Sequence, residues 1–392
     1  MRDNHESEYT EPHAHSLSAA TAPTLANVSS AKAQQPSDID GAISLLRDCV
    51  GGNAGERLLI VSEPECNGFY DDQAPKLTAA AGRALGMKVY LTESESFISN
   101  DDDKAILIDS LRGFDHIVFF SRVGDQIRFD TSTNLPSTTM CYTLSGGSLN
   151  SNFGTACHHG MCEIKAAIDV AFENAENIHV TCPRGTDYQG KPRWSGLQPV
   201  EVSLKRFPLL VPRPVPSIGF SGRIALSRFL IGSGNRHYEP YHLDLPNDVI
   251  ACVEDNHITH FEGVSTDVKR VENHYLSVSE QLGIEPWYVD SWHAGIHPGC
   301  QFETDAQADI LRWSGTAFGN PRILHFHTCG QYAPGEVSWN VLDPTIYLDG
   351  VAVWDKGRLY ANRIAGGTEI LSRHPKLAAL FANPEYKIGL VD

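Results

Sequence analysis

The sequence predicts two fold classes in one chain: an N-terminal α/β domain with a parallel sheet, followed by a mostly antiparallel α+β domain. Three observations lead to this prediction. Short apolar runs alternate with helical patterns in the first half of the chain. Proline and glycine then punctuate short β-like runs, some of which are joined by hairpin turns. At 392 residues and 41% hydrophobic content, the chain is long enough to bury the cores of two ordinary domains.

The first 36 residues differ in composition from the rest. They are rich in Ser, Ala, Thr, Pro and Gln, and they show no hydrophobic period. Such a segment cannot offset its ordering entropy by burial. We therefore expect a tail or arm over residues 1–36, the α/β domain over 37–195, and the α+β domain, which carries the site, over 196–392.

The α/β domain is expected to begin with a helix that Ser37 can cap and that Gly51-Gly52 ends. Apolar residues at helical spacing predict further helices over 72–85, 104–111 and 160–175. Buried apolar runs predict strands over 57–62, 88–91, 116–120, 138–144 and 177–181. Because strands and helices alternate at short spacing, these strands should form a parallel sheet.

Two hairpins and a helix characterise the second domain. Residues 250–253 and 257–261 flank an Asp-Asn turn, and residues 351–354 and 358–360 flank a Lys-Gly turn. A helix over 266–281 should end at a glycine. This order of elements favours antiparallel pairing.

The composition excludes several classes of partner. A net charge of −17 would repel phosphates, so we expect neither nucleic acid nor an acidic membrane as a partner. No apolar run reaches the ~18 residues that span a bilayer, and the N-terminus lacks a secretory-signal pattern. The 9 cysteines are scattered and include no Cys-x-x-Cys pair, which favours a reducing cytoplasm.

Several common catalytic motifs are also missing from the sequence. It contains no Gly-rich phosphate loop, no Gly-x-Ser-x-Gly elbow and no His-Glu-x-x-His helix. The commonest nucleotide-binding, serine-hydrolase and zincin interpretations are therefore removed.

Histidines gather in the last third of the chain, and His325-x-His327 is the first of two clusters. On a strand, alternate side chains share a face, so these two rings should point the same way together with Ile323. Leu324 and Phe326 should point into the core. Two imidazoles on one face are a common start to a metal or substrate site, and the alternative is a solvated or stacked face.

The second cluster pairs His293 with His297. This spacing would put both rings on one helical face, but Gly295 lies between them and Pro298-Gly299 follows, so we expect a loop. A loop can present one ring to a site, whereas an ordinary polar loop histidine is the alternative. His242 begins a His-x-Asp pair that could complete a two-histidine, one-carboxylate iron(II) triad, although the spacing neither supports nor excludes this.

A series of short motifs runs in order through most of the chain after residue 40. They are a first strand at Glu56–Pro64, a Gly-Thr-Asp turn at Gly185–Asp187, a hairpin end at His260–Gly263 and a histidine loop at Ser291–Gly295. A closing meander follows, at Leu348–Gly350 and Lys356–Leu359. This order resembles the 2,5-dihydroxypyridine 5,6-dioxygenase family, which is related to the aminopeptidase T metallopeptidases.

The resemblance implies an iron(II) centre that opens a hydroxylated heteroaromatic ring with O2. His293 matches the loop that bears the family's first iron-binding histidine. The family's further His-x-Asp pair, just upstream of the Leu-Asp-Gly strand, has no match here, and Glu336 and Ser338 stand near that place. Glu336 could replace the carboxylate ligand or act as a general base, and His325 and His327 could supply new ligands.

We therefore expect His293, His325 and Glu336 as metal ligands. Catalytic or pocket groups are expected among Glu336, His327, His297 and His242. The expected ion is Fe(II), with another divalent metal or no metal as alternatives.

The expected activity is that of an enzyme acting on a small heteroaromatic or amide-like compound, most simply a non-haem iron(II) ring-cleaving dioxygenase. Two alternatives remain open. One is a metal-dependent hydrolase, either of aminopeptidase T type or acting on a small ring, and the other is a metal-free descendant that binds a ligand or peptide. The acidic surface and the N-terminal arm are compatible with a homo-oligomer.

Overall fold

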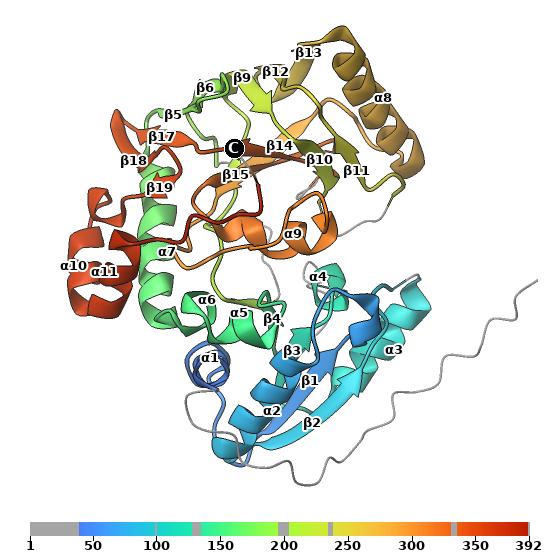
Figure 1. Ribbon diagram of the computed structural model, residues 1–392, viewed down its shortest axis with the longest axis vertical. Helices are drawn as coiled ribbons and strands as arrows, with labels where there is room; N and C mark the ends of the chain where they lie inside the picture. The colour runs from blue at the N-terminus through green and yellow to red at the C-terminus, as the bar shows by residue number, and fades with distance from the viewer. Residues whose placement is uncertain are drawn as a thin grey trace, which may run out of the picture.

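The computed structural model describes residues 39–98, 100–127, 135–194, 204–233, 238–330 and 335–390. The predicted tail over residues 1–36 lies outside them. One lobe contains β1–β4 with α1–α4, and a larger lobe contains two further sheets (Figure 1). In the described part of the chain, no helix combines the length and apolarity needed to cross a membrane.

The smaller lobe is built on a five-stranded sheet in the order β2-β1-β3-β4-β7, and every pair in it is parallel. Its strands are β1 (Arg57–Ser62), β2 (Lys88–Glu93), β3 (His116–Phe120), β4 (Ser137–Cys141) and β7 (Lys205–Phe207). The central strand β3 is buried along its whole length, as expected for a parallel sheet covered on both faces. The predicted parallel-sheet domain is confirmed.

The helical segments of this lobe are α1 (Asp40–Ile43), the π-helix η2 (Ser44–Val50), η3 (Glu65–Asn67), α2 (Gln73–Ala84), α3 (Asp101–Leu111), α4 (Val123–Ile127), α5 (Gly146–Asn150) and α6 (Asn152–Thr155). The first helix ends where the sequence predicts, because Gly51 adopts the left-handed conformation with φ 78°.

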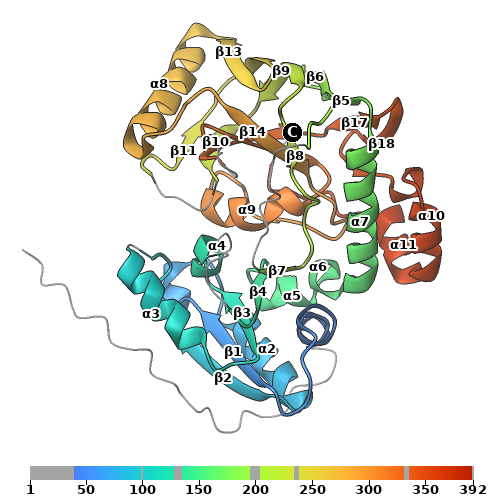
Figure 2. The same cartoon turned by 180° about the vertical axis from the view of Figure 1, so that it is seen from behind.

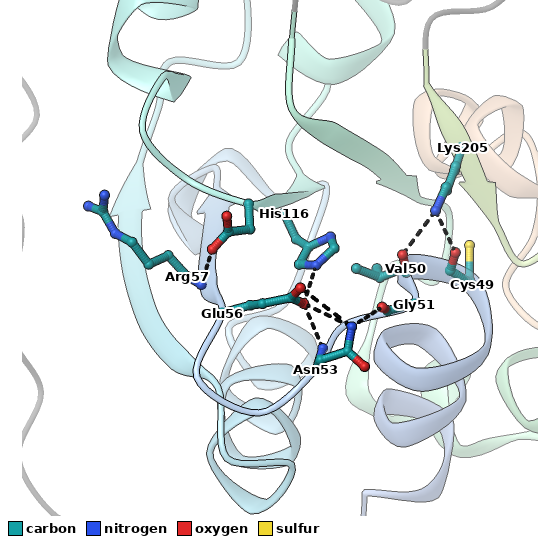
Figure 3. A network of polar contacts seen from close by, with 9 residues as sticks. Cys49, Val50, Gly51, Asn53, Glu56, Arg57, His116 and Lys205 are labelled. Carbon is teal, nitrogen blue, oxygen red and sulfur yellow. Dashed lines mark hydrogen bonds and ion pairs between the residues drawn. The ribbon is translucent and has the colours of Figure 1, made fainter.

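Strand β7 returns to the smaller lobe after the chain has already entered the larger one. Lys205 at its start donates to the carbonyl oxygens of Cys49 at 3.1 Å and Val50 at 2.9 Å, which end η2 (Figure 3). A cation beside the last carbonyls of a helix is a favourable cap. The chain thus passes between the lobes more than once. Strand pairing alone does not define which segments fold as a unit, so the domain boundary at residue 195 stays a prediction.

The larger lobe contains two antiparallel sheets. The six-stranded sheet, in the order β11-β10-β16-β15-β14-β8, consists of β8 (Val215–Pro216), β10 (Phe229–Gly232), β11 (His242–Asp244), β14 (Val289–Ala294), β15 (Ile323–Thr328) and β16 (Val337–Leu342). The eight-stranded sheet, in the order β13-β12-β9-β6-β5-β17-β18-β19, consists of β5 (Ile178–Thr181), β6 (Asp187–Gly190), β9 (Phe220–Leu226), β12 (Val249–Glu254), β13 (His257–Glu262), β17 (Thr345–Leu348), β18 (Val351–Asp355) and β19 (Arg358–Leu359). The predicted antiparallel α+β domain is confirmed.

One predicted strand belongs to a different sheet from the one expected. The run over 177–181 was expected among the parallel strands, but β5 pairs antiparallel with β6 and β17. The physical reason is the short turn after β5, where Gly185 has φ 103°. So short a connection can join only antiparallel neighbours.

The two antiparallel sheets pack face to face over an aromatic core. Tyr188 of the eight-stranded sheet lies 5.6 Å from Phe326 of the six-stranded sheet, measured between ring centres, and Phe220 lies 5.9 Å from Trp292. The helical segments of this lobe are α7 (His158–Asn174), α8 (Ser265–Leu282), α9 (Ile310–Thr316), η4 (Ala317–Gly319), η5 (Ala361–Arg363), α10 (Gly367–Arg373) and α11 (Pro375–Ala382).

The other face of the six-stranded sheet packs on a separate, smaller core. Ile231, Ile323 and Leu342 contribute to it from the sheet, and Trp313 contributes from α9. In both views α9 lies next to α4 of the smaller lobe (Figures 1 and 2). This face of the sheet is therefore turned toward the junction of the two lobes.

Candidate functional site

Three histidine rings gather on the face of the six-stranded sheet that is turned toward α9. His325 and His327 alternate along β15, and His293 on β14 is the direct cross-strand partner of His325. The ring centres are 5.3 Å apart for His293 and His325, 5.1 Å for His293 and His327, and 4.8 Å for His325 and His327. All three residues are buried, with exposed fractions of 5–8%.

The alternation of β15 follows the sequence prediction. Ile323 shares the face of His325 and His327 and joins the core under α9. Leu324 and Phe326 point the other way, into the core between the two antiparallel sheets. The period of two along a strand therefore places the pair of rings correctly.

His293 lies on a strand, and the predicted loop over 293–297 is wrong at this end. Strand β14 extends to Ala294 because His293 and Ala294 pair with His325 and Leu324 of β15. Trp292 and Ala294 fill the core between the sheets, which leaves the ring of His293 on the opposite face. The turn signals Gly295 and Pro298 act only after the strand has ended.

His297 lies in the following loop and has other contacts. Its ring meets Phe153 of α6 edge-on at 4.9 Å, and its Nδ1 accepts a hydrogen bond from the backbone of Gly299 at 3.1 Å. Burial lowers the pKa of His297 to about 3, so the ring is neutral. These contacts make it a packing group between the lobes, and they do not bring it into the histidine cluster.

His242 is exposed on the edge strand β11. It stands in one cross-strand row with Ile231, Ser338 and His327, and therefore on the same face of the sheet. Three strand spacings separate it from His327, which is about 14 Å at ~4.8 Å for each strand. The structure does not bring His242 into the cluster.

Asn340 supports the cluster from β16 and was not among the predicted residues. Its amide oxygen accepts a hydrogen bond from Nδ1 of His325 at 3.0 Å. This contact fixes the tautomer and leaves Nε2 of His325 as the nitrogen with a lone pair. The sequence signal that could have identified Asn340 is its spacing of two from Ser338 and four from Glu336. In the structure, Ser338 and Asn340 pair with His327 and His325.

Glu336 is buried immediately before β16, with an exposed fraction of 5%. Its backbone N–H donates to the carbonyl oxygens of Thr328 at 2.8 Å and Cys329 at 3.0 Å, and its carbonyl oxygen accepts from the hydroxyl of Tyr238 at 3.0 Å. Glu336 lies in a bend, and its carboxylate contributes to the raised pKa of Tyr241.

Aromatic residues connect the cluster to the smaller lobe. The ring centre of Phe318 lies 6.0 Å from His293 and 5.9 Å from His325, and Tyr142 lies 6.2 Å from Phe318. The hydroxyl of Tyr142, just after β4, donates to Asp125 at 2.9 Å. Asp125 and Tyr142 follow the carboxyl ends of the parallel strands β3 and β4, which is where ligands bind in open α/β sheets.

The pKa of a further tyrosine, Tyr241, depends on charged groups of both lobes. Burial raises the pKa of Tyr241, and the carboxylates of Asp125 and Glu336 add to the rise. Asp125 belongs to the smaller lobe and Glu336 to the larger, so the polar groups of both lobes face one another at this junction.

The ring-centre separations in the histidine cluster are compatible with three imidazoles that bind one divalent ion. Imidazole nitrogens bound at ~2.1 Å to one ion place three facially arranged ring centres about 5 Å from one another. The observed separations of 4.8–5.3 Å agree with this arrangement. Imidazole donors suit Fe(II), zinc, copper and nickel. The predicted ligand Glu336 lies in the bend before β16, and the ring separations add His327 as a candidate for the third ligand.

A second group of potential ligands lies elsewhere in the described residues. Cys252, His260 and Glu262 each offer one donor atom, and these atoms all lie within 4.8 Å of one another. They project from the eight-stranded sheet, so they are not part of the histidine cluster.

Comparisons with known proteins show what the chain is similar to. No protein-family model and no curated protein sequence matches it. Among solved structures, a 2,5-dihydroxypyridine dioxygenase from Pseudomonas putida KT2440 matches with a TM-score of 0.53 and 14% identity, over 83% of this chain and 96% of that one. AmpT from Thermus thermophilus matches with a TM-score of 0.45 and 11% identity, over 82% of this chain and 98% of that one. The relationship suggested by the sequence motifs is thus confirmed at the level of the fold, which this chain shares with a 2,5-dihydroxypyridine dioxygenase.

Proposed function

We propose that this protein is a metal-dependent enzyme that acts on a small molecule at the junction of its two lobes, most simply as an iron(II) ring-cleaving dioxygenase. The observation that carries the proposal is the set of three buried imidazoles, His293, His325 and His327, with ring centres 4.8–5.3 Å apart. Bound Fe(II) would supply a centre that brings O2 and substrate together for ring opening.

The chain's own residues have distinct tasks in this proposal. Asn340 orients His325 through its Nδ1, which keeps Nε2 available as a ligand atom. Phe318 and the sheet exclude water from the imidazoles. Glu336 is a buried carboxylate just before β16, suited to take a proton from a substrate hydroxyl.

Side chains near the histidine cluster support a substrate class. Phe318 and Tyr142 offer aromatic surface, against which a flat ring can stack. Asp125 offers a hydrogen-bond acceptor from the smaller lobe. The shared fold with a 2,5-dihydroxypyridine dioxygenase supports a small hydroxylated heteroaromatic compound as the substrate class.

One observation favours a metal-dependent hydrolase as the second candidate. Three imidazoles with no carboxylate among them form a ligand set that catalytic zinc sites use. With zinc bound there, Glu336 would serve as the base for a water molecule. The two candidates share the same ligands and differ in whether O2 is consumed.

We also propose a cytoplasmic location, because all nine cysteines are free.

The test is metal analysis of protein purified without chelator, combined with oxygen-electrode assays on dihydroxypyridines. We expect His293→Ala to hold about one divalent ion per chain fewer than the wild type and to lose at least ~10³-fold of the activity. His159→Ala, which changes an exposed ring on α7, is the matched control and should keep both. Substrate turnover without O2 uptake would instead favour the hydrolase, and full activity of metal-free protein would overturn both candidates.

A further inference from the structure

The solvent-facing side of the eight-stranded sheet brings together a sulfur, a nitrogen and an oxygen donor. Cys252 on β12 is the direct cross-strand partner of His260 on β13, and Glu262 lies two residues further on the same face. Their donor atoms lie within 4.8 Å of one another. The side chains of His260 and Glu262 are exposed by 59% and 43%, so an ion can reach them from solvent.

A threonine and a glutamate orient the ring of His260. The hydroxyl of Thr259 donates to the carbonyl oxygen of Cys252 at 3.2 Å, and its oxygen lies 3.1 Å from Nδ1 of His260. The other ring nitrogen, Nε2, lies 3.4 Å from Oε1 of Glu262. Histidine ligands in metal sites typically donate their second ring N–H to an oxygen.

The converging atoms are electron-rich, and a cation already compensates them. Arg223 on β9 donates to Oε1 of Glu262 at 2.9 Å and lies 2.7 Å from Oε2, and it lowers the pKa of Glu262 to about 2. The thiol of Cys252 donates to Oε1 at 3.4 Å, and Nη1 of Arg223 lies 4.0 Å from its sulfur. The Arg223 side chain is 47% exposed, so it can turn into solvent when another cation enters.

We propose that Cys252, His260 and Glu262 form a second metal site, selective for Zn²⁺ and independent of the histidine cluster. Sulfur, imidazole and carboxylate donors together suit zinc, whereas calcium and magnesium prefer oxygen ligands alone. Three protein ligands leave the fourth tetrahedral position to water. On binding, the Cys252 thiol releases its proton to solvent and Arg223 gives up its contact with Oε1.

The place of the site in the sheet gives the ion a structural role. Strand β13 is the edge of the eight-stranded sheet, and β12 is its neighbour. An ion bound by residues of both strands would stabilise the pairing of β13 with β12. Because the ion binds the folded chain, it raises the stability in proportion to the logarithm of its concentration over the dissociation constant.

The experiment is a Co²⁺ titration of the full chain, followed by displacement with Zn²⁺. Co²⁺ bound to a thiolate gives a near-ultraviolet charge-transfer band, which imidazole ligands do not produce. We expect a saturable band at about one equivalent that Zn²⁺ removes. Cys252→Ser should abolish the band, and Cys66→Ser, which changes an exposed cysteine of the smaller lobe, should keep it.

Two further variants make the result specific. Glu262→Gln should weaken binding at least about tenfold, and Arg223→Gln should tighten it, because the competing cation is gone. The band should persist in His293→Ala, so failure of the histidine cluster as a metal site would leave this result unchanged. Absence of the band in the wild type, or an equal band in Cys252→Ser, would overturn the proposal.

Discussion

The two proposed ligand triads of this molecule share one strand arrangement and differ in burial. In the six-stranded sheet, His325 and His327 alternate on one strand and His293 stands opposite the first of them. In the eight-stranded sheet, His260 and Glu262 alternate on β13, and Cys252 stands opposite the first. Both triads follow from the pleat of a β-strand together with antiparallel register.

Burial decides what each triad can contain. The first lies under α9 and the smaller lobe and uses imidazoles, which can be neutral and so avoid the high cost of burying a charge. The second lies at the surface and includes an ionised carboxylate beside an arginine, since water screens both charges. The same backbone geometry thus gives an enclosed site of neutral donors in one sheet and an open site of charged donors in the other.

The largest effect is expected from a buried histidine outside both triads. Burial lowers the pKa of His274, on α8, to about 4, so its ring stays neutral in the folded chain. An unfolded histidine takes up a proton near pH 6.5, so the unfolded state binds more protons between about pH 6.5 and pH 4. The free energy of unfolding should therefore decrease as the pH falls through this window, by up to ~3 kcal/mol from this group.

Urea unfolding at a series of pH values measures this decrease in the free energy of unfolding. His274→Gln should show a weaker pH dependence than the wild type, and Leu276→Gln, an exposed position on the same helix, should not change it. Identical dependence in His274→Gln and the wild type would mean that burying this imidazole carries no penalty, which would weaken the contrast between buried and exposed donors.

An intermediate effect is expected at the support of the buried triad. Asn340→Leu removes the acceptor for Nδ1 of His325 while keeping a similar volume, and it should weaken metal binding by about 10–100-fold. Competition with a chelator of known affinity measures this change. Asn340→Asp, which keeps an acceptor, should restore most of the affinity. Equal affinities in all three proteins would show that Asn340 does not position a ligand.

The smallest effect is expected at the exposed triad in the absence of metal. Cys252→Ser, measured with chelator present, should change the free energy of unfolding by no more than about 0.5 kcal/mol, because serine is similar in size and its hydroxyl can still donate to Glu262. Urea unfolding in chelator is the measurement. A loss well above 1 kcal/mol would mean that the thiol contributes to packing, and the comparison between an enclosed and an open triad would then fail.

Local patterns in the sequence predicted the parts of the site that depend on one strand. The shared face of His325 and His327, with Leu324 and Phe326 behind it, requires only the alternation of β15. The cross-strand position of His293 requires pairing with a distant strand, which no local pattern reveals. The expected loop there was wrong because pairing with β15 extends β14 to Ala294.

The fold shows the same division between local and distant information. The four strands β1 to β4 were predicted with their parallel arrangement, because strand–helix alternation is a local signal. The sheet membership of β5 was not, since it depends on the turn after it and on β17. The triad of Cys252, His260 and Glu262 was not predicted. It depends on the register of its hairpin, which has a bulge next to Cys252 and cannot be derived from composition or spacing.

The pairing of β5 with β17 has a consequence for the order in which the protein assembles during synthesis. Ile178 aligns with Leu348, so two central neighbours of the eight-stranded sheet are separated by nearly half of the chain. While the ribosome makes the intervening residues, the β5–β6 hairpin presents an uncovered edge to the cell. Contacts of such long sequence separation slow folding and leave strand edges open to other chains. We expect nascent chains that stop before β17 to depend on chaperones, whereas such chains already contain every strand of the five-stranded sheet.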